Sequence, residues 1–198
     1  MENTDPPDRR SIILDAAFKV FMNYGFKRTT MADIADAAGI SRPALYLEFK
    51  NKADIYRAGF IDMLEKTFRD VDAALEGGAP LHERLIAALN AGIVVPIRNI
   101  ANTPHGAELF EVKQELAGDL GQDWNTALER TLESAISSAD ANGEIALSNG
   151  KVTSTDLARL IVSSVEGVKK RMTDWDAVER DLARIVNLMV RPLARRPH

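Results

Sequence analysis

Side chains suited to binding phosphate and base edges lie between Thr29 and Lys52. A helix-terminal hydroxyl or a lysine ammonium can hold a phosphate, a guanidinium can pair twice with guanine, and a phenol donates a hydrogen bond. A solvated helix face would rarely place Tyr and Leu in its middle. The residues concerned are Thr29, Thr30, Arg42, Tyr46, Lys50 and Lys52.

Two short helices joined by a glycine turn are predicted to position these groups. Thr30 and Asp33 have the spacing of a capping box, which starts the first helix. Gly39 can take the positive φ of a tight turn. Ser41 is a candidate N-cap for the second helix, and Pro43 is tolerated there because it falls in the first turn.

The second of these helices would turn Leu45 and Phe49 inward, four positions apart. That leaves Arg42, Ala44, Tyr46, Leu47 and Lys50 on outer or flanking surfaces. Spacing alone is equally typical of an ordinary αα-hairpin and of a helix-turn-helix that enters the major groove. The exposed phosphate and base ligands favour the helix-turn-helix.

Charge is distributed unevenly along the chain. The chain has 198 residues and a net charge of −4, but residues 9–52 contain eight basic and four acidic residues. A basic N-terminal quarter on an acidic remainder is typical of a DNA-binding module joined to another domain.

The sequence from Ile12 to Ala58 closely resembles the N-terminal domain of tetracycline-repressor-like (TetR/AcrR) regulators. It contains the run AAFKVFMNYGFKRTTMADIADAAGISRPALYLEFKNKADIY. The resemblance rests on Phe21, Gly25, Phe26, Thr29, Thr30, Ile34, Ala35, Ala38, Gly39, Leu45, Tyr46, Phe49 and Lys52. Beyond this quarter of the chain the match is only in helical character and length.

The resemblance implies a DNA-binding role for particular residues. Thr29 and Thr30 would contact phosphates from the start of a helix, where anions are attracted. Lys52 would hold a phosphate, and Lys50 belongs to the same surface. The recognition helix would be lined by Ser41, Arg42, Ala44, Tyr46 and Leu47. Pro43 and Glu48 depart from the commonest family pattern, and we expect the Glu48 carboxylate to point away from DNA.

The rest of the chain also reads as helix, which predicts an all-α fold. An N-terminal three-helix DNA-binding domain (9–52) would be joined by a long helix to a helical ligand-binding and dimerisation domain (53–195). Helices are predicted at about 12–24, 52–75, 81–100, 107–117, 123–141, 155–171 and 175–193, with no sheet.

Two sets of apolar residues in the second domain suggest further sites. Long apolar stripes on the last two helices suit a two-fold four-helix bundle, although such stripes usually form core. The candidate dimer residues are Leu157, Ile161, Val178, Leu182, Ile185 and Met189. A candidate ligand pocket, for which core packing is the alternative, comprises Phe60, Met63, Phe68, Ile93, Phe110 and Trp124.

Other chemistries are disfavoured. His105, Glu108, Glu111 and Glu115 share a helical face, but one histidine makes a solvated acidic face the better interpretation than a metal site. The chain has no cysteine, and no triad order, phosphate-binding glycine loop or dinucleotide fingerprint appears. We expect no cofactor and no enzyme activity. A purely architectural DNA-binding protein would not need the apolar second domain.

No signal-peptide core and no bilayer-length apolar run is expected, so the predicted location is the cytoplasm, without a membrane partner. Together these features predict a homodimeric transcriptional regulator, a repressor that a small apolar or amphipathic molecule releases from a palindromic operator.

Overall fold

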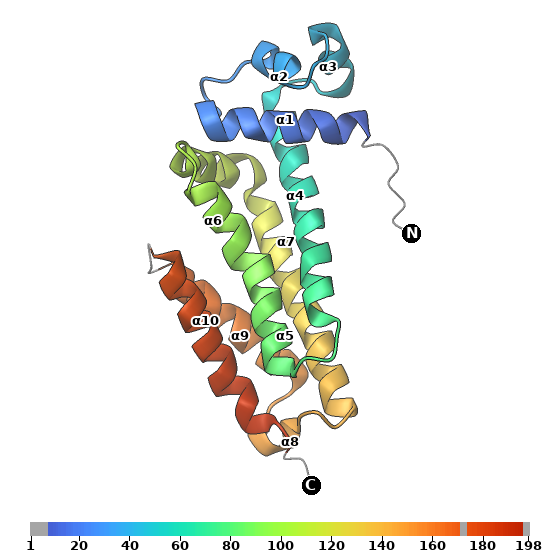
Figure 1. Cartoon of the computed structure of the whole chain (residues 1–198), viewed down its shortest axis with the longest axis vertical. Helices are drawn as coiled ribbons and strands as arrows, with labels where there is room; N and C mark the ends of the chain where they lie inside the picture. The colour runs from blue at the N-terminus through green and yellow to red at the C-terminus, as the bar shows by residue number, and fades with distance from the viewer. Residues whose placement is uncertain (1–7, 171–173, 196–198) are drawn as a thin grey trace. The chain divides into compact units, whose positions relative to one another are not determined.

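The structure, a computed structural model, describes residues 8–170 and 174–195, and this part of the chain is mainly helical. No strand occurs within these residues, and Ile145 and Ala194 form an isolated β-bridge. The predicted all-α class is confirmed (Figure 1). The helices are α1 (Arg9–Tyr24), α2 (Met31–Ala37), α3 (Arg42–Glu48), α4 (Lys52–Leu75), α5 (Leu81–Leu89), η1 (Asn90–Val94), α6 (Val95–Ala101), α7 (Gly106–Ala141), α8 (Leu147–Gly150), α9 (Ser154–Lys169), α10 (Trp175–Val190) and η2 (Arg191–Leu193).

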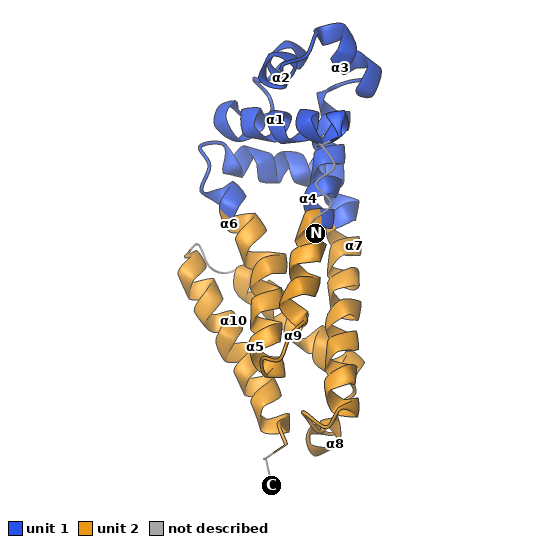
Figure 2. Ribbon diagram, turned by 45° about the vertical axis from the view of Figure 1, so that its right-hand side comes forward, with its two compact units in different colours: residues 1–65, 99–120 blue, residues 66–98, 121–198 orange. Residues whose placement is uncertain are grey.

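The chain divides into two compact units (Figure 2). Unit 1 extends to Glu65 and resumes from Asn99 to Leu120, whereas unit 2 comprises Lys66–Arg98 and the chain from Gly121 onward. The boundaries fall inside α4, α6 and α7. The predicted functional division at residue 52 therefore does not coincide with the packing units.

Unit 1 is built around an aromatic cluster. The rings of Phe21 and Phe26 lie 5.2 Å apart, and Tyr56 lies 5.5 Å from Phe26 and 5.6 Å from Phe18. Ile34 is also fully buried in this core. Burying each large apolar side chain contributes about 1.5–3 kcal/mol, so the short helices α2 and α3 are stabilised by packing rather than by their own length.

The first part of α7 completes the core of unit 1. Leu109 and Val112 are buried with the apolar residues of α1 and α4. The Tyr56 hydroxyl donates a 2.8 Å hydrogen bond to the Leu109 carbonyl, and burial raises the pKa of Tyr56. A segment distant in sequence thus belongs structurally to the N-terminal unit.

Unit 2 has a separate apolar core in which α9 and α10 pack side by side. Leu85 of α5, Leu132 of α7, Ile161 of α9 and Leu182 of α10 are all fully buried in it. Arg98 lies 3.3 Å from Glu179 of α10, an ion pair at the edge of this core.

Two helical predictions differ from the structure in detail. The helix expected at 81–100 contains the π-helical turn η1 between α5 and α6. A Cβ on Gly92 would lie 3.0 Å from Val71 Cγ2, so this turn packs tightly on α4. The helices expected at 107–117 and 123–141 form α7, whose Ala117 has non-helical angles of φ −147° and ψ 24°.

Leu81–Ala101 is also more apolar than expected. It has 21 residues and an 18-residue window with a mean hydropathy of 1.3, sufficient by length and composition to span a bilayer. Core helices of soluble proteins pass the same test, and Leu81, Leu85, Ala88 and Leu89 are buried in the core of unit 2. The segment is therefore weak evidence for a membrane span.

Candidate nucleic-acid interface

Side-chain caps define the starts of α2 and α3. The Asp33 amide donates to Thr30 Oγ1 at 3.3 Å, and the Thr30 amide donates to Asp33 Oδ2 at 2.7 Å, which completes the predicted capping box. The hydrogen bonds from the Thr30 amide and hydroxyl hold the pKa of Asp33 below its usual value. Ser41 Oγ accepts from the Ala44 amide at 3.3 Å. Gly39 has φ +67° in the turn between these helices, where other residues would be strained.

One face of α3 is anchored and the opposite face is open. Leu45 is fully buried and Phe49, at the C-cap, is 4% exposed. In contrast, Tyr46 is 49% exposed and Leu47 85%. Ser41, Arg42 and Lys50 are exposed, and Ala44 is half-buried. A face with two large exposed apolar side chains among cationic groups has the composition of a contact surface rather than of solvated helix.

Thr29 does not belong to the exposed surface, contrary to its predicted role. Its side chain is buried, with 2% exposure, and its hydroxyl donates a 2.6 Å hydrogen bond to the Gly25 carbonyl. It fixes the turn that precedes α2. Thr30 is exposed, but its hydroxyl is already engaged in the capping box.

The predicted phosphate-binding role of Lys52 also needs a correction. Its ammonium donates to the carbonyls of Phe26, Lys27 and Thr29 at 2.7, 3.1 and 3.0 Å. Because an ammonium has three donors, none remains for a phosphate in this conformation. The group also lies 4.6 Å from the Phe26 ring centroid. Lys52 therefore ties the α1–α2 loop to the start of α4.

The sequence predicted a solvated acidic face on α7. In the structure, Glu108 and Glu111 on this face also contact Lys27 in the α1–α2 loop. Oε1 of Glu108 accepts a 2.7 Å hydrogen bond from the Lys27 amide, and its Oε2 lies 3.6 Å from His105 Nδ1. Glu111 lies 3.8 Å from Lys27 Nζ, with both side chains largely exposed. Sequence reasoning missed this support for the α1–α2 loop because nothing local links residues 27 and 108.

Arg57 and Asp119 form a second contact that the sequence did not reveal. The Arg57 guanidinium donates two hydrogen bonds to the carboxylate, at 2.8 and 2.5 Å, and a third to the Leu116 carbonyl at 2.8 Å. The hydrogen bonds from Arg57 lower the pKa of Asp119 to about 2. This pair fastens α4 to α7 within unit 1.

Comparison with known proteins identifies the family. Residues 13–58 match the family described as bacterial regulatory proteins, tetR family. The HTH-type transcriptional regulator YhgD of Bacillus subtilis (strain 168) is 30% identical over 136 residues, 69% of either chain. The HTH-type transcriptional repressor ComR of Escherichia coli (strain K12) is 30% identical over 145 residues, 69% of this chain and 67% of that protein.

The chain belongs to the TetR family. A solved structure described as the SmeT–triclosan complex has the same fold, with a TM-score of 0.62 and 17% identity over 92% of this chain and 91% of that one. As a TetR-family protein the chain is a transcriptional regulator and not an enzyme. Within the described residues, no group of three or more His, Cys, Asp or Glu side chains could hold a metal ion.

Four of the six candidate dimer residues are buried within the chain itself. Leu157, Ile161, Val178 and Leu182 are at most 3% exposed inside one chain, where they form the core of unit 2. Ile185 and Met189 are half-buried. The apolar periodicity alone could not show which of these residues are buried within one chain. The large apolar side chains that are open on α9 and α10 are Leu160 (47%) and Leu188 (77%).

The predicted ligand-pocket residues do not share one unit. Phe60, Met63 and Phe110 lie in unit 1, with Lys113 Nζ 5.4 Å from the Phe60 ring. Phe68, Ile93 and Trp124 lie in unit 2, and the Phe68 and Trp124 ring centroids are 4.2 Å apart. Only the second group is compatible with a pocket inside unit 2.

Proposed function

We propose that this TetR-family regulator is a homodimeric cytoplasmic repressor that binds a palindromic operator and releases it when a small apolar or amphipathic molecule binds unit 2. The observation that carries the DNA-binding part is the exposure of Tyr46 and Leu47 on α3, opposite the buried Leu45. Arg42 and Lys50 flank them and are exposed. Each α3 would enter one major groove, with Arg42 on a base edge and Lys50 on a phosphate.

The proposed dimer uses the open side of α9 and α10. Leu160 and Leu188 are exposed in the isolated chain, with half-buried Ile185 and Met189 nearby in sequence. Large exposed apolar groups on adjacent helices favour burial against a second copy. Two α3 helices related by a two-fold axis would then read two half-sites about one helical turn apart.

The proposed effector site lies in the interior of unit 2. Phe68, Ile93 and Trp124 supply the bulky apolar groups that ligand pockets use. Within the described residues, the buried side-chain oxygens without a hydrogen-bond partner are Asn90 Oδ1 and Asn187 Oδ1. Such oxygens suit a ligand with a hydrogen-bond donor. The SmeT–triclosan complex supplies a precedent in the same fold for a chlorinated aromatic ligand.

Selection of bound sequences from random DNA tests the operator proposal. We expect the full-length protein to recover a palindrome, and a quantitative mobility shift to give one dimer per site. If the selected DNA molecules share no common sequence, the proposed recognition of base edges by α3 is wrong. Loss of the palindrome with retention of a single half-site would instead contradict the dimeric mode.

Addition of triclosan and a panel of other apolar molecules to the protein–operator complex tests release. At least one should lower operator affinity, because an effector acts only through its different affinities for the bound and free states. The Trp124→Phe variant should keep the fold and change the effector concentration needed to release the operator. Trp175→Phe, in α10, is the matched control and should leave that concentration unchanged. A panel without any effect on affinity would contradict effector control.

A further inference from the structure

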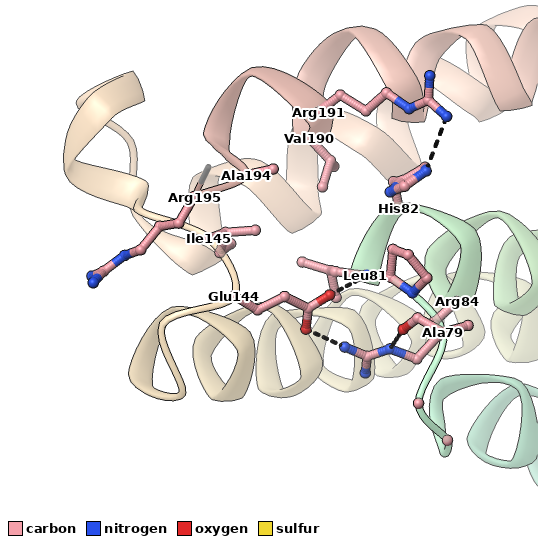
Figure 3. A pocket seen from close by; sticks show the side chains of 13 residues that line it. Ala79, Leu81, His82, Arg84, Glu144, Ile145, Val190, Arg191, Ala194 and Arg195 are labelled. Atoms are coloured by element: carbon pink, nitrogen blue, oxygen red, sulfur yellow. Dashed lines mark hydrogen bonds and ion pairs between the residues drawn. The ribbon is translucent and has the colours of Figure 1, made fainter. Parts of the chain in front are cut away.

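A cleft in unit 2, at the ends of α5 and α10, has a cavity volume of about 660 Å³ (Figure 3). Its walls come from the α4–α5 loop, the first turn of α5, the segment after α7 and the residues that follow α10. The volume lies within the range of small-molecule sites. None of the residues proposed above for DNA, effector or dimer contacts lines this cleft, so the inference is independent of the proposed function.

The single carboxylate in the lining is already engaged. Glu144 accepts hydrogen bonds from the Leu81 amide and, at 2.6 Å, from Arg84 Nη2. Arg84 in turn donates to the Ala79 and Leu75 carbonyls at 2.9 and 3.1 Å. These bonds fix the α4–α5 loop. They also leave Glu144 with little capacity to neutralise other cations in the lining.

Arg191 and His82 form the polar group that remains available. Arg191 Nη2 lies 3.2 Å from His82 Nε2. A guanidinium can only donate, so in this hydrogen bond Nε2 is the acceptor, which is the tautomer that carries the ring proton on Nδ1. Glu83 Oε1 lies 3.8 Å from the same Nε2 but does not line the cleft. The Arg191 donors that His82 does not use and the Nδ1–H of His82 are thus donors suited to an anion.

Apolar and further cationic groups complete the cleft. Leu81, Ile145 and Val190 line the cleft, and each is at most 2% exposed, so they form its closely packed aliphatic floor. Arg195 is exposed at its rim, and its main-chain amide is held by the Glu144 carbonyl at 3.1 Å. Within the described residues, no carboxylate contacts the guanidinium of Arg191 or of Arg195. The Arg195 guanidinium points away from His82 and Arg191 (Figure 3), so the lining combines the positive charge of Arg191 with aliphatic side chains.

We propose that this cleft binds an organic anion with an aliphatic body, whose carboxylate or phosphate head contacts Arg191 and His82. The body lies against Leu81, Ile145 and Val190. An anionic head alone would gain little at an exposed guanidinium, whereas an aliphatic body adds about 25 cal/mol per Å² of its own apolar surface that the cleft removes from water. The site thus selects amphipathic anions over both inorganic ions and neutral alcohols of the same chain length.

Isothermal titration of the full-length protein with octanoate, octyl phosphate and 1-octanol tests the proposal. At least one anion should bind, and 1-octanol should bind about tenfold or more weakly, because it lacks the charge-assisted hydrogen bonds. Comparison of the affinities for octanoate and octyl phosphate identifies the preferred anionic head group. Equal binding of the alcohol, or no binding of either anion, would overturn the proposal.

Variants separate this cleft from any effector pocket elsewhere in unit 2. Arg191→Gln and His82→Phe should each weaken anion binding about tenfold. Arg130→Gln removes the same charge from an exposed position on α7 outside the cleft and should leave binding unchanged. Circular dichroism establishes that the variants are folded. Unchanged anion affinity in both cleft variants would place the binding elsewhere and refute the assignment.

Discussion

The main-chain amide of Lys27 donates a 2.7 Å hydrogen bond to Oε1 of Glu108, a residue 81 positions further along the chain. The loop that leads into α2 is therefore held by a side chain of α7. Glu108 is 20% exposed, whereas the neighbouring Glu111 is 75% exposed. The two glutamates make a matched pair, because only the first accepts a main-chain hydrogen bond.

Glu108→Ala should destabilise the fold by about 1–2 kcal/mol, because it leaves the Lys27 amide without its charged acceptor. Glu111→Ala should change stability by no more than about 0.5 kcal/mol, as exposed ion pairs contribute little. Urea unfolding followed by circular dichroism measures both. Equal effects of the two variants would show that the hydrogen bond to Lys27 does not contribute.

Lys52→Ala should destabilise the protein by about 1–3 kcal/mol, because three carbonyls lose a charged donor. Lys50→Ala removes an exposed lysine two positions earlier and should be neutral within about 0.5 kcal/mol. The same unfolding experiment compares them. If Lys52→Ala is as stable as Lys50→Ala but binds DNA less tightly, Lys52 is a phosphate ligand after all.

Arg42→Ala should cost about 1–3 kcal/mol on the cognate operator and relax preference at one base pair in each half-site. Lys50→Ala should weaken binding to all sequences alike and lower the salt slope by about one unit for each phosphate that is no longer neutralised. Titrations of cognate and scrambled DNA at several salt concentrations distinguish these outcomes. An equal loss of affinity on both DNAs for Arg42→Ala would make Arg42 a phosphate ligand only.

Leu188→Asp should dissociate the proposed dimer without unfolding the chain, because Leu188 is 77% exposed. Leu182→Asp should unfold unit 2, since its site is fully buried and an unpaired charge there costs several kcal/mol. Leu47→Asp, on exposed α3, is the control that should leave the oligomeric state unchanged. Analytical ultracentrifugation with circular dichroism measures assembly and folding. An intact Leu188→Asp dimer would exclude this face.

The Arg57–Asp119 pair predicts a defined acid dependence. The folded-state pKa of Asp119 is about 2, below its unfolded value of about 3.9. Its contribution to stability is therefore complete above about pH 4 and is lost as the pH falls through about 2. Asp119→Asn should flatten the dependence of the unfolding free energy in this window. An unaltered acid dependence would mean that other carboxylates account for it.

Local sequence was sufficient for the caps of α2 and α3 and for most of the helices. Thr30 with Asp33 and Ser41 before Pro43 specify helix starts through short-range hydrogen bonds, and the 52–75 helix was predicted with its observed ends. The exposed face of α3 followed from its buried anchors Leu45 and Phe49. The family resemblance at the N-terminus is confirmed by the matching residues 13–58.

Contacts between residues far apart in the chain could not be predicted from the sequence. The burial of Thr29 and the ties from Lys52 depend on how the α1–α2 loop closes on α4. The role of Glu108 depends on a segment some eighty residues away. Periodicity showed that α9 and α10 have apolar residues at helical spacing, but it could not distinguish the buried Leu182 from the exposed Leu188.

The π-helical turn Asn90–Val94 accommodates one extra residue between α5 and α6. A π turn contains one residue more than the α-helical turn it replaces, so the segments on either side keep their facing: Leu85 remains in the core, and Arg98 remains beside Glu179. Deleting one residue between Asn90 and Val94 would join α5 and α6 into a regular α-helix with little rotation of either half. Adding a second residue would instead turn Arg98 away from Glu179, so we expect this helix to tolerate shortening at this point better than lengthening.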